Sequence, residues 1–289
     1  MPQTKLEQLR ALLRSCGSCL TAYSGGVDSV FLAFVAHQEL GDRALAAIAD
    51  SPSLPRAELA EALALGERFG FPVRVVRSRE FADPSYLANP QNRCYFCKQA
   101  LFEELVPLAR EEGFALLAYG ENASDVGDHR PGAVAAAEFQ VRAPLKEVGL
   151  TKAEIRELSA RLGLPTADKP QMACLSSRIP YGEEVTVEKL RMIEAAEAYL
   201  KGLGFRDIRV RHHELRAGAL ARLEIGPEEL PQAVVNGRPT EIAERLKALG
   251  YSQVTLDLQG YRRGSANEPI QPIRFKTAPL PGSARPATG

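Results

Sequence analysis

The stretch from Leu20 to Ser29, Leu-Thr-Ala-Tyr-Ser-Gly-Gly-Val-Asp-Ser, limits the possible folds of this chain more than any other. A short apolar run ends in a Ser-Gly-Gly turn, and the apolar segment that begins at Val30 continues as a predicted helix. Backbone N–H groups converge where such a turn becomes a helix, and this arrangement suits a phosphate group. The stretch therefore predicts a strand, a phosphate-binding loop and a helix in succession.

The side chains of this loop indicate which kind of phosphate loop it is. Ser24 and Ser29 add hydroxyl donors to the turn at Gly25 and Gly26, and Asp28 places a carboxylate beside the expected polyphosphate. A carboxylate at that place is best explained as a ligand of Mg²⁺. No Lys-Ser or Lys-Thr pair closes the loop, so it is not a Walker A loop. The alternative is an ordinary glycine turn between a strand and a helix.

Strands and helices alternate beyond this loop. The segments 43–50, 72–77 and 114–119 are predicted strands, and the segments 56–69 and 99–112 are predicted helices. This alternation predicts an α/β fold with a doubly wound parallel sheet. The other elements expected before residue 165 are a helix over 5–14, a short helix after residues 130–132, a last strand over 141–146, and a helix from a Thr151–Glu154 capping box to about Leu162.

The carboxyl ends of these strands carry further candidates for the site. In a doubly wound sheet the ligand lies beyond the carboxyl ends of the strands. The segments 43–50 and 114–119 both end there, close to the glycine loop. The polar segment 120–125 could bind substrate or metal, although an ordinary polar loop is the alternative. The residues that we expect to line the nucleotide pocket are Ala49, Asp50, Ser51, Gly120, Glu121 and Asn122.

A second, smaller α+β domain is predicted after an irregular segment over 165–184. Its elements are a helix over 187–203, strands over 207–212, 220–225 and 252–258, and helices near 227–235 and 240–249. The predicted division is a nucleotide domain over residues 1–180 and a substrate or oligomerisation domain over 181–268. Residues 269–289 are rich in Pro, Ala, Gly and Ser, so we expect them to be disordered.

Composition excludes several classes of function. The 36 Lys and Arg residues balance the 36 Asp and Glu residues, which argues against a wide nucleic-acid-binding surface. No apolar run approaches the roughly 20 residues of a membrane span, so we expect a cytoplasmic protein. The 5 cysteines are an odd number without a signal peptide, so metal binding or sulfur chemistry fits better than a disulfide scaffold. Cys16 and Cys19 share a Cys-x-x-Cys spacing, but packing in the apolar strand is the favoured explanation.

Three further cysteines form the second candidate site. Cys94 and Cys97 precede a predicted helix, whose N-terminus favours thiolates. A Cys-x-x-Cys pair alone is a weak signal, and Cys174 adds a third thiol if the two loops meet. Three thiolates suit a 4Fe-4S cluster with one open iron, whereas structural zinc requires a fourth ligand. Zinc and three unconnected buried thiols remain alternatives.

Three arginines are candidates to bind anions. Arg178, four residues after Cys174, is predicted to hold a substrate phosphate or carboxylate through two parallel hydrogen bonds, and a solvated loop charge is the alternative. Arg209 and Arg211 flank Val210 on a predicted strand, so both side chains lie on one face. They are therefore candidates for the phosphate of a nucleotide substrate.

These segments resemble one family of enzymes over residues 5–268. The glycine loop is similar to that of the N-type ATP pyrophosphatases, which split ATP between its α and β phosphates. Within that superfamily the chain resembles the LarE family of ATP-dependent sulfur transferases, through the motifs Asn92-Arg-Cys-Tyr-Phe-Cys-Lys98, Gly120-Glu-Asn-Ala-Ser-Asp125 with Arg130-Pro-Gly132, Ala173-Cys-Leu-Ser-Ser-Arg-Ile-Pro-Tyr-Gly182, Arg209-Val-Arg-His-His213 and Tyr261-Arg-Arg-Gly264.

The resemblance implies a specific reaction. Members adenylate a carboxylate of pyridinium-3,5-biscarboxylic acid mononucleotide and replace the adenylate with a thiocarboxylate, in the assembly of the nickel-pincer nucleotide cofactor of lactate racemase. Cys174 matches the reactive cysteine of the family. Because Cys94 and Cys97 are also present, the chain resembles the three-cysteine branch, in which a 4Fe-4S cluster carries the transferred sulfide. The resemblance also implies a homo-oligomer, a hexamer. The sequence does not identify the source of the sulfur that reloads the enzyme, and a sulfur donor protein and free sulfide are both candidates.

Three other functions compete with this interpretation. A tRNA thiolase of the same superfamily can also use three cysteines, but the neutral net charge and the lack of a basic RNA-binding module argue against it. An amidotransferase of the NAD- or GMP-synthetase kind needs an ammonia source and does not explain the thiols. A nucleotide- or cluster-binding sensor without turnover is distinguished by its failure to cleave ATP when a carboxylate substrate is added.

Overall fold

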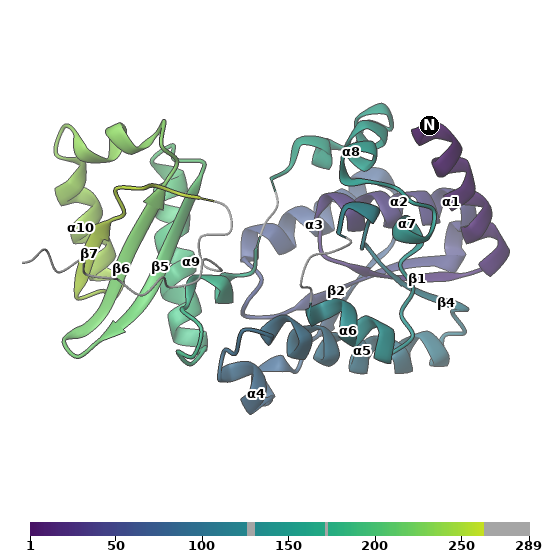
Figure 1. Ribbon diagram of the computed structural model, residues 1–289, viewed down its shortest axis with the longest axis horizontal. Helices are drawn as coiled ribbons and strands as arrows, with labels where there is room; N and C mark the ends of the chain where they lie inside the picture. Colours follow the sequence, from purple (N-terminus) through teal and green to yellow (C-terminus); the bar gives the residue numbers. More distant parts are fainter. Residues whose placement is uncertain (126–130, 171–172, 263–289) are drawn as a thin grey trace, which may run out of the picture.

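The computed structural model describes residues 1–125, 131–170 and 173–262 and contains two β-sheets, which lie side by side in Figure 1. The first sheet is entirely parallel, with the strand order β3-β2-β1-β4. The second sheet has the order β5-β6-β7. The strands are β1 (Cys19–Tyr23), β2 (Ala44–Asp50), β3 (Val73–Arg77), β4 (Leu116–Tyr119), β5 (Ile208–Leu215), β6 (Gly218–Ile225) and β7 (Gln253–Leu256). The segment 269–289, for which disorder is predicted, lies outside the described residues.

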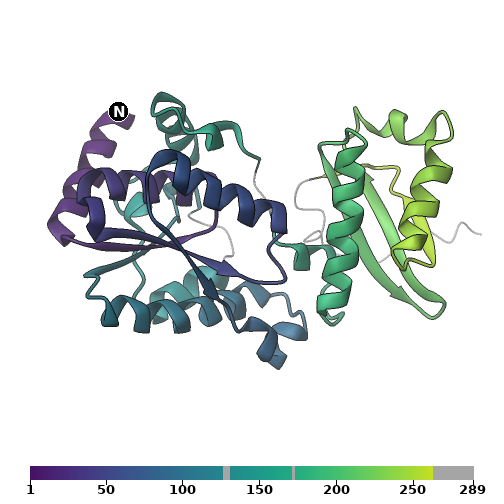
Figure 2. The ribbon, with the colours of Figure 1, turned by 180° about the vertical axis from the view of Figure 1, so that it is seen from behind.

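Helices cover both faces of the first sheet, as Figures 1 and 2 show. Successive residues of β1 point to opposite faces, so Cys19 and Tyr23 join one apolar core while Leu20 and Ala22 join another. This arrangement confirms the predicted α/β, doubly wound architecture. The helices on the first face are α1 (Pro2–Cys16), α2 (Val27–Leu40), α3 (Arg56–Phe69) and α8 (Lys152–Arg161), and those on the second are α5 (Arg93–Glu111) and α6 (Pro131–Glu138).

The predicted last strand over 141–146 is wrong. Arg142 forms a single parallel bridge with Ala118 of β4, and the chain then enters the short helix α7 (Pro144–Glu147). Pro144 lies in the first turn of that helix, where its lack of an N–H group costs nothing, whereas a strand would lose a ladder hydrogen bond there. The capping box at Thr151 and Glu154 is present as predicted and begins α8.

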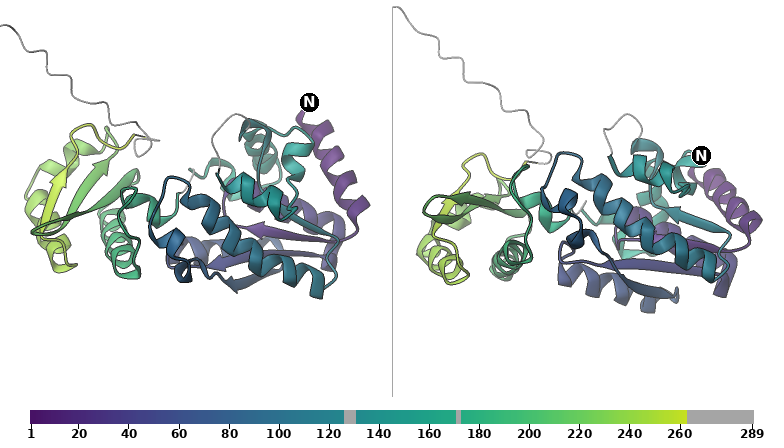
Figure 3. Two further views of the ribbon diagram at one scale, coloured as in Figure 1. Left: turned by 60° about the horizontal axis from the view of Figure 1, so that its bottom comes forward. Right: turned by 90° about the horizontal axis from the view of Figure 1, so that it is seen from below.

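The second sheet has one apolar face and one charged face. Two helices, α9 (Val187–Gly202) and α10 (Arg238–Ala248), lie on the same side of it in Figure 3. Ile208 and Val210 of β5 join their apolar core, so Arg209 and Arg211 point to the opposite face. The remaining described elements are the short helix α4 (Pro84–Leu87) and a set of 3₁₀ turns. These turns are η1 (Gly41–Arg43), η2 (Glu80–Ala82), η3 (Ala123–Asp125), η4 (Pro165–Asp168), η5 (Leu175–Arg178) and η6 (Leu230–Val234).

The chain that connects the two sheets is fastened to the segment around α4. Asn89 is fully buried, and its side-chain amide donates to the carbonyls of Ile179 (3.2 Å) and Pro180 (2.7 Å). The backbone N–H of Gly182 donates in turn to the carbonyl of Asn89 at 2.9 Å. An apolar cluster packs around this connection, and its buried members are Tyr86, Leu175, Ile179, Val185, Leu190 and Ile193. Among the described helices, none has the length and apolar character required to cross a membrane.

Candidate functional site

The glycine loop lies between the end of β1 and the start of α2. Gly25 has φ of +70°, and a Cβ atom there would lie 2.8 Å from the Cβ of Ala62, so the turn requires glycine. Ser29 Oγ accepts from the backbone N–H of Ser24 (3.1 Å) and donates to the carbonyl of Gly26 (3.1 Å), which holds the loop in shape. The backbone N–H groups at the start of α2 therefore lie at the carboxyl end of β1, as predicted for a phosphate site.

Two lysines that the sequence analysis missed bring positive charge to this loop. Lys152 Nζ lies 2.7 Å from the carboxylate of Asp28, and Lys169 Nζ lies 3.4 Å from the carbonyl of Gly25. Lys169 also pairs with Glu58 at 2.7 Å. Lys152 directly follows the N-cap residue Thr151 and is the first residue of α8, so its place could have been inferred only by knowing that α8 starts beside the loop. A polyphosphate at the loop would have two ammonium groups within reach.

The residues after β2 divide into an exposed and a buried part. Asp50 forms a surface ion pair with Arg56. Ser51 turns inward, where its hydroxyl bonds to the hydroxyl of Ser53 (2.8 Å) and donates to the carboxyl of Glu80. Glu80, a second residue missed at the sequence level, is 1% exposed, and burial raises its pKa. Ala49 and Asp50 thus stay near the loop edge, whereas Ser51 belongs to a buried polar cluster.

The residues after β4 close the other side of the glycine loop. A Cβ atom on Gly120 would lie 2.9 Å from the backbone N of Ser29, so Gly120 allows the two strand ends to approach. Glu121 is buried and accepts from Lys146 Nζ at 2.9 Å. Asn122 Oδ1 accepts from the backbone N–H of Ser124 at 2.9 Å, which shapes a local turn. Gly120 therefore lies against the loop, while the side chains of Glu121 and Asn122 have bonds within their own segment.

The three cysteines predicted to act together lie near one another. Cys94 and Cys97 lie in the first turns of α5, and Cys174 directly precedes η5. Loss of hydration and then the neighbouring Cys174 raise the pKa of Cys94, although its side chain reaches the surface. Burial brings the pKa of Cys97 to about 12. The prediction that the helix N-terminus makes both residues thiolates is therefore wrong for the free thiols, because desolvation outweighs the helix dipole.

Arg93 links the two cysteine segments, and the sequence analysis assigned it no role. Its side chain is 4% exposed. Nη1 donates to the carbonyl of Ser176 (3.0 Å) and to the side chain of Asn89, and Nη2 lies 3.9 Å from the sulfur of Cys174. A buried guanidinium beside the thiols stabilises negative charge on sulfur. Its partner Ser176 is far along the chain, so no local sequence signal could have identified it.

Arg178 does not have the role predicted for it. The side chain is 0% exposed, and Nε and Nη2 donate to the two carboxylate oxygens of Glu197 at 2.9 and 3.0 Å. Nη1 donates to the carbonyls of Ala173 (2.7 Å) and Cys174 (3.0 Å). Because these protein groups occupy the guanidinium, Arg178 is neither a ligand of a substrate anion nor a solvated loop charge. Arg178 instead fixes the backbone of Cys174 against α9.

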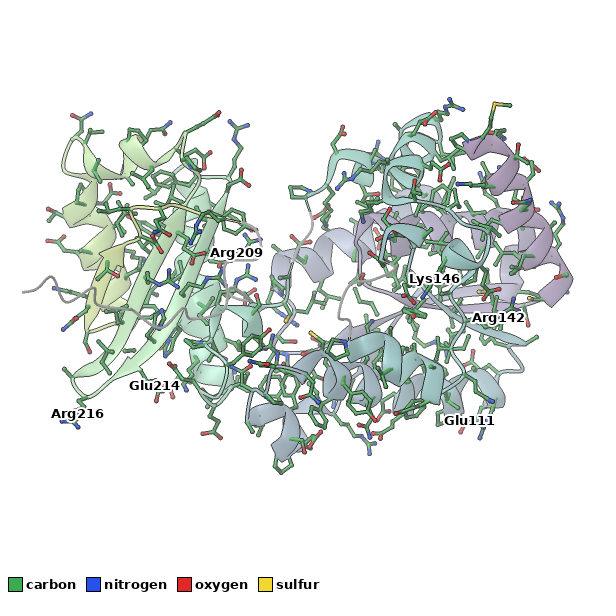
Figure 4. All side chains as sticks on the ribbon, viewed as in Figure 1. Glu111, Arg142, Lys146, Arg209, Glu214 and Arg216 are labelled. Atoms are coloured by element: carbon green, nitrogen blue, oxygen red, sulfur yellow. The ribbon has the colours of Figure 1, made fainter. Side chains whose placement is uncertain are left out.

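Arg209 and Arg211 share one face of β5, as predicted, but they differ in their partners. Arg211 donates to the carbonyl of Ser177 (2.8 Å) and pairs with Glu224 (2.8 Å). Arg209 donates to the carbonyl of its neighbour Ile208 (2.6 Å) and to the hydroxyl of Tyr261 (3.3 Å). Figure 4 shows Arg209 on the side of the second sheet that faces the first. Of the two, Arg209 is the better candidate to bind a substrate anion.

The three thiols are not arranged as a preformed site for a single metal ion. Within the described ranges 1–125, 131–170 and 173–262, no group of three His, Cys, Asp or Glu side chains is arranged to hold a metal ion. A structural zinc ion requires such a group. Arg93 and Lys98, whose charges favour the thiolate form of Cys94, would balance the negative charge of a cluster.

Comparisons with known proteins agree with this geometry. No family model matches the chain. An uncharacterized protein of Synechocystis sp. is 45% identical over 267 residues, which cover 92% of this chain and 98% of the relative. The pyridinium-3,5-bisthiocarboxylic acid mononucleotide synthase of Lactiplantibacillus plantarum is 32% identical over 276 residues, 95% of this chain and 98% of the relative. A tRNA-specific 2-thiouridylase of Azorhizobium caulinodans is 30% identical over 220 residues, 62% of this chain and 55% of the relative.

The parallel sheet and the glycine loop fit an N-type ATP pyrophosphatase fold, and these relatives indicate ATP-dependent sulfur transfer on that fold. The chain belongs to the family of the pyridinium-3,5-bisthiocarboxylic acid mononucleotide synthases.

Proposed function

We propose that the protein adenylates a carboxylate of pyridinium-3,5-biscarboxylic acid mononucleotide and converts it to a thiocarboxylate, in the assembly of the nickel-pincer nucleotide cofactor. One contact supports the proposal most. The backbone N–H of Leu175 donates to the carbonyl of Ser53 at 2.8 Å, so the loop after β2 is bonded to the loop that carries Cys174. ATP activation at the edge of the first sheet and sulfur chemistry at the cysteines therefore belong to adjoining parts of one site.

The glycine loop carries out the adenylation in this proposal. A carboxylate oxygen of the substrate attacks the α phosphorus of ATP, an acyl–oxygen–phosphorus bond forms, and the bond to pyrophosphate breaks. The N–H groups after Gly26 would hold the departing pyrophosphate. Asp28 would hold Mg²⁺, which neutralises polyphosphate charge when it is bound. Lys152 would then leave Asp28 for the pyrophosphate, because both groups bind the same ammonium.

The cysteine site carries out the sulfur transfer. Cys94, Cys97 and Cys174 would hold a 4Fe-4S cluster, which supplies an iron atom that carries the transferable sulfide when it is bound. Sulfur transfer would form a carbon–sulfur bond at the carbonyl carbon of the adenylate, and AMP would leave with the oxygen. Arg93 balances negative charge at sulfur, and Arg178 fixes the backbone of Cys174. The apolar cluster around Leu175 excludes water, which would otherwise hydrolyse the adenylate.

Separate assays of the two half-reactions test this proposal. Cys174→Ala should abolish thiocarboxylate formation while substrate-dependent exchange of labelled pyrophosphate into ATP continues, because the glycine loop is intact. Cys94→Ala should lose iron and multiple turnovers in anaerobically purified protein. Cys16→Ala, which changes a cysteine outside the trio, is the matched control and should retain both half-reactions. Equal loss of both half-reactions in Cys174→Ala would show that this cysteine has a structural role instead.

The same assays distinguish the alternatives. A tRNA thiolase would consume ATP with tRNA rather than with the pyridinium dicarboxylate, and a sensor would consume none with either. Iron and sulfide analysis separates a cluster from zinc. The hexameric state, the cytoplasmic location and the sulfur donor stay predictions, which size determination, localisation and reloading with free sulfide would test.

A further inference from the structure

Tyr261 is held over Arg209 by the turn that follows β7. The centre of the Tyr261 ring lies 4.6 Å from the guanidinium carbon of Arg209, and Nη2 of Arg209 donates to the tyrosine hydroxyl at 3.3 Å. The backbone N–H of Tyr261 donates to the carbonyl of Ile225 at 2.9 Å. Gly260 has φ of +67°, and a Cβ atom there would lie 2.7 Å from the same carbonyl. The turn therefore requires glycine and fixes the tyrosine at the charged face of the second sheet.

The charges around Arg209 explain why an aromatic ring is found there. Glu197 pairs with Arg178, and Glu224 pairs with Arg211. In the part of the chain that the structure describes, Arg209 has no ion pair with a carboxylate. Burial lowers the pKa of Arg209, and the neighbouring charges of Arg178 and Arg211 lower it further. The negative face of the Tyr261 ring offsets part of this cost through a cation–π contact.

A pyridinium ring is a planar cation, as a guanidinium is, and both groups stack on the face of an aromatic ring. A pyridinium mononucleotide also carries a phosphate, which needs a cationic partner. When such a substrate binds, its pyridinium ring would replace Arg209 on the face of Tyr261, and Arg209 would move to the substrate phosphate. Each charged group of the substrate would then have a partner. A mononucleotide with a neutral ring would break the contact between Arg209 and Tyr261 without forming a new cation–π contact in its place.

We propose that Tyr261 is a specificity-determining residue that binds the cationic pyridinium ring of the substrate by exchange with Arg209. The choice of a pyridinium substrate rests on the proposed function. The position of Tyr261 beside the sulfur site follows from the contacts themselves, because Arg209 adjoins Arg178, which binds the carbonyl of Cys174 at 3.0 Å.

Calorimetric binding of two simple probes to the full-length protein tests the proposal. Nicotinic acid mononucleotide has a pyridinium ring, a carboxylate and a phosphate, whereas orotidine 5′-monophosphate has a carboxylate and a phosphate on a neutral ring. Tyr261→Leu should weaken binding of the first probe by roughly 3- to 30-fold and change that of the second by less than about 2-fold. Tyr261→Phe, which keeps the aromatic face, should bind both probes about as the unaltered protein does.

Tyr199→Leu is the matched control. The Tyr199 ring also lies under an arginine, Arg245, at 5.9 Å, but it packs against the apolar core of the second sheet and not at the charged face. This variant should bind both probes normally. Equal weakening of both probes in Tyr261→Leu, unchanged binding of both, or no binding of nicotinic acid mononucleotide to the unaltered protein would each overturn the proposal. Failure of the proposed function would be seen differently, as absence of thiocarboxylate formation in a protein that still binds the pyridinium probe through Tyr261.

Discussion

Removal of the carboxylate of Glu197 is the most direct test of how the Cys174 segment is held. Three hydrogen bonds end at that carboxylate, from Nε and Nη2 of Arg178 (2.9 and 3.0 Å) and from the backbone N–H of Val210 (3.1 Å). Glu197→Ala leaves a guanidinium that is 0% exposed without its counter-ion. Loss of one partner from a buried ion pair typically costs about 3–5 kcal/mol, so we expect a decrease of that size in the free energy of unfolding.

Urea-induced unfolding measures this change. The chain contains 0 Trp and 8 Tyr residues, so tyrosine fluorescence and circular dichroism are suitable probes. Glu241→Ala is the matched control on α10, because its pair with Arg238 is exposed, and it should cost less than about 1 kcal/mol. The double variant Arg178→Met, Glu197→Leu should recover most of the lost stability, since both charges are then removed together. A cost for Glu197→Ala as small as that of the control would refute this reasoning.

Three further predictions concern the site and the pH dependence. Arg93→Met should lower the ratio of thiocarboxylate to AMP formed, because Cys174 and the carbonyl of Ser176 lose their hydrogen-bond donor. Quantification of both products measures this ratio, and an unchanged ratio would mean that Arg93 is only a packing residue. Lys152→Met should raise the KM for Mg-ATP by roughly 10- to 100-fold, the cost of a charged hydrogen bond, whereas Lys201→Met on exposed α9 surface should not. The hydrogen bond from Lys5 lowers the pKa of Glu154 to about 2, below the roughly 4.3 of an unfolded chain. The ionised Glu154 carboxylate therefore contributes its full stabilisation of the fold above about pH 4.3, and this contribution is lost as the pH falls towards 2. The difference in Tm between Glu154→Gln and the unaltered protein should therefore shrink from pH 5 to pH 3, and a constant difference would contradict this.

Local signals predicted the parts of the fold that depend on near neighbours along the chain. The strand, glycine loop and helix around Ser24–Ser29 and the capping box at Thr151 each lie within a few residues, so their physics is contained in the sequence pattern. The segment 141–146 shows the limit of such patterns. Its apolar residues suit a strand, but Pro144 leaves it with a single bridge, at Arg142.

The partners of buried charges could not be predicted in this way. The spacing placed Arg178 close to Cys174, which is correct, but its function depends on Glu197, which is 19 residues away on another element. Arg93 and its acceptor at Ser176 are separated by 83 residues. A charged residue in an irregular segment suggests a ligand contact, whereas only the packed structure shows whether the protein itself supplies the counter-ion.

The hydrogen bonds that hold the connection between the two sheets determine which parts of this protein can be exchanged between relatives. The backbone N–H of Gly182 bonds to the carbonyl of Asn89, and that of Val185 bonds to the carbonyl of Leu87. Recombination at residue 180 would therefore place the two sides of these bonds in different parents. A chimaera that takes its C-terminal part from a relative should also take the segment 86–93 from that relative. The natural unit of inheritance in this enzyme is thus discontinuous in sequence, and its first segment ends directly before Cys94.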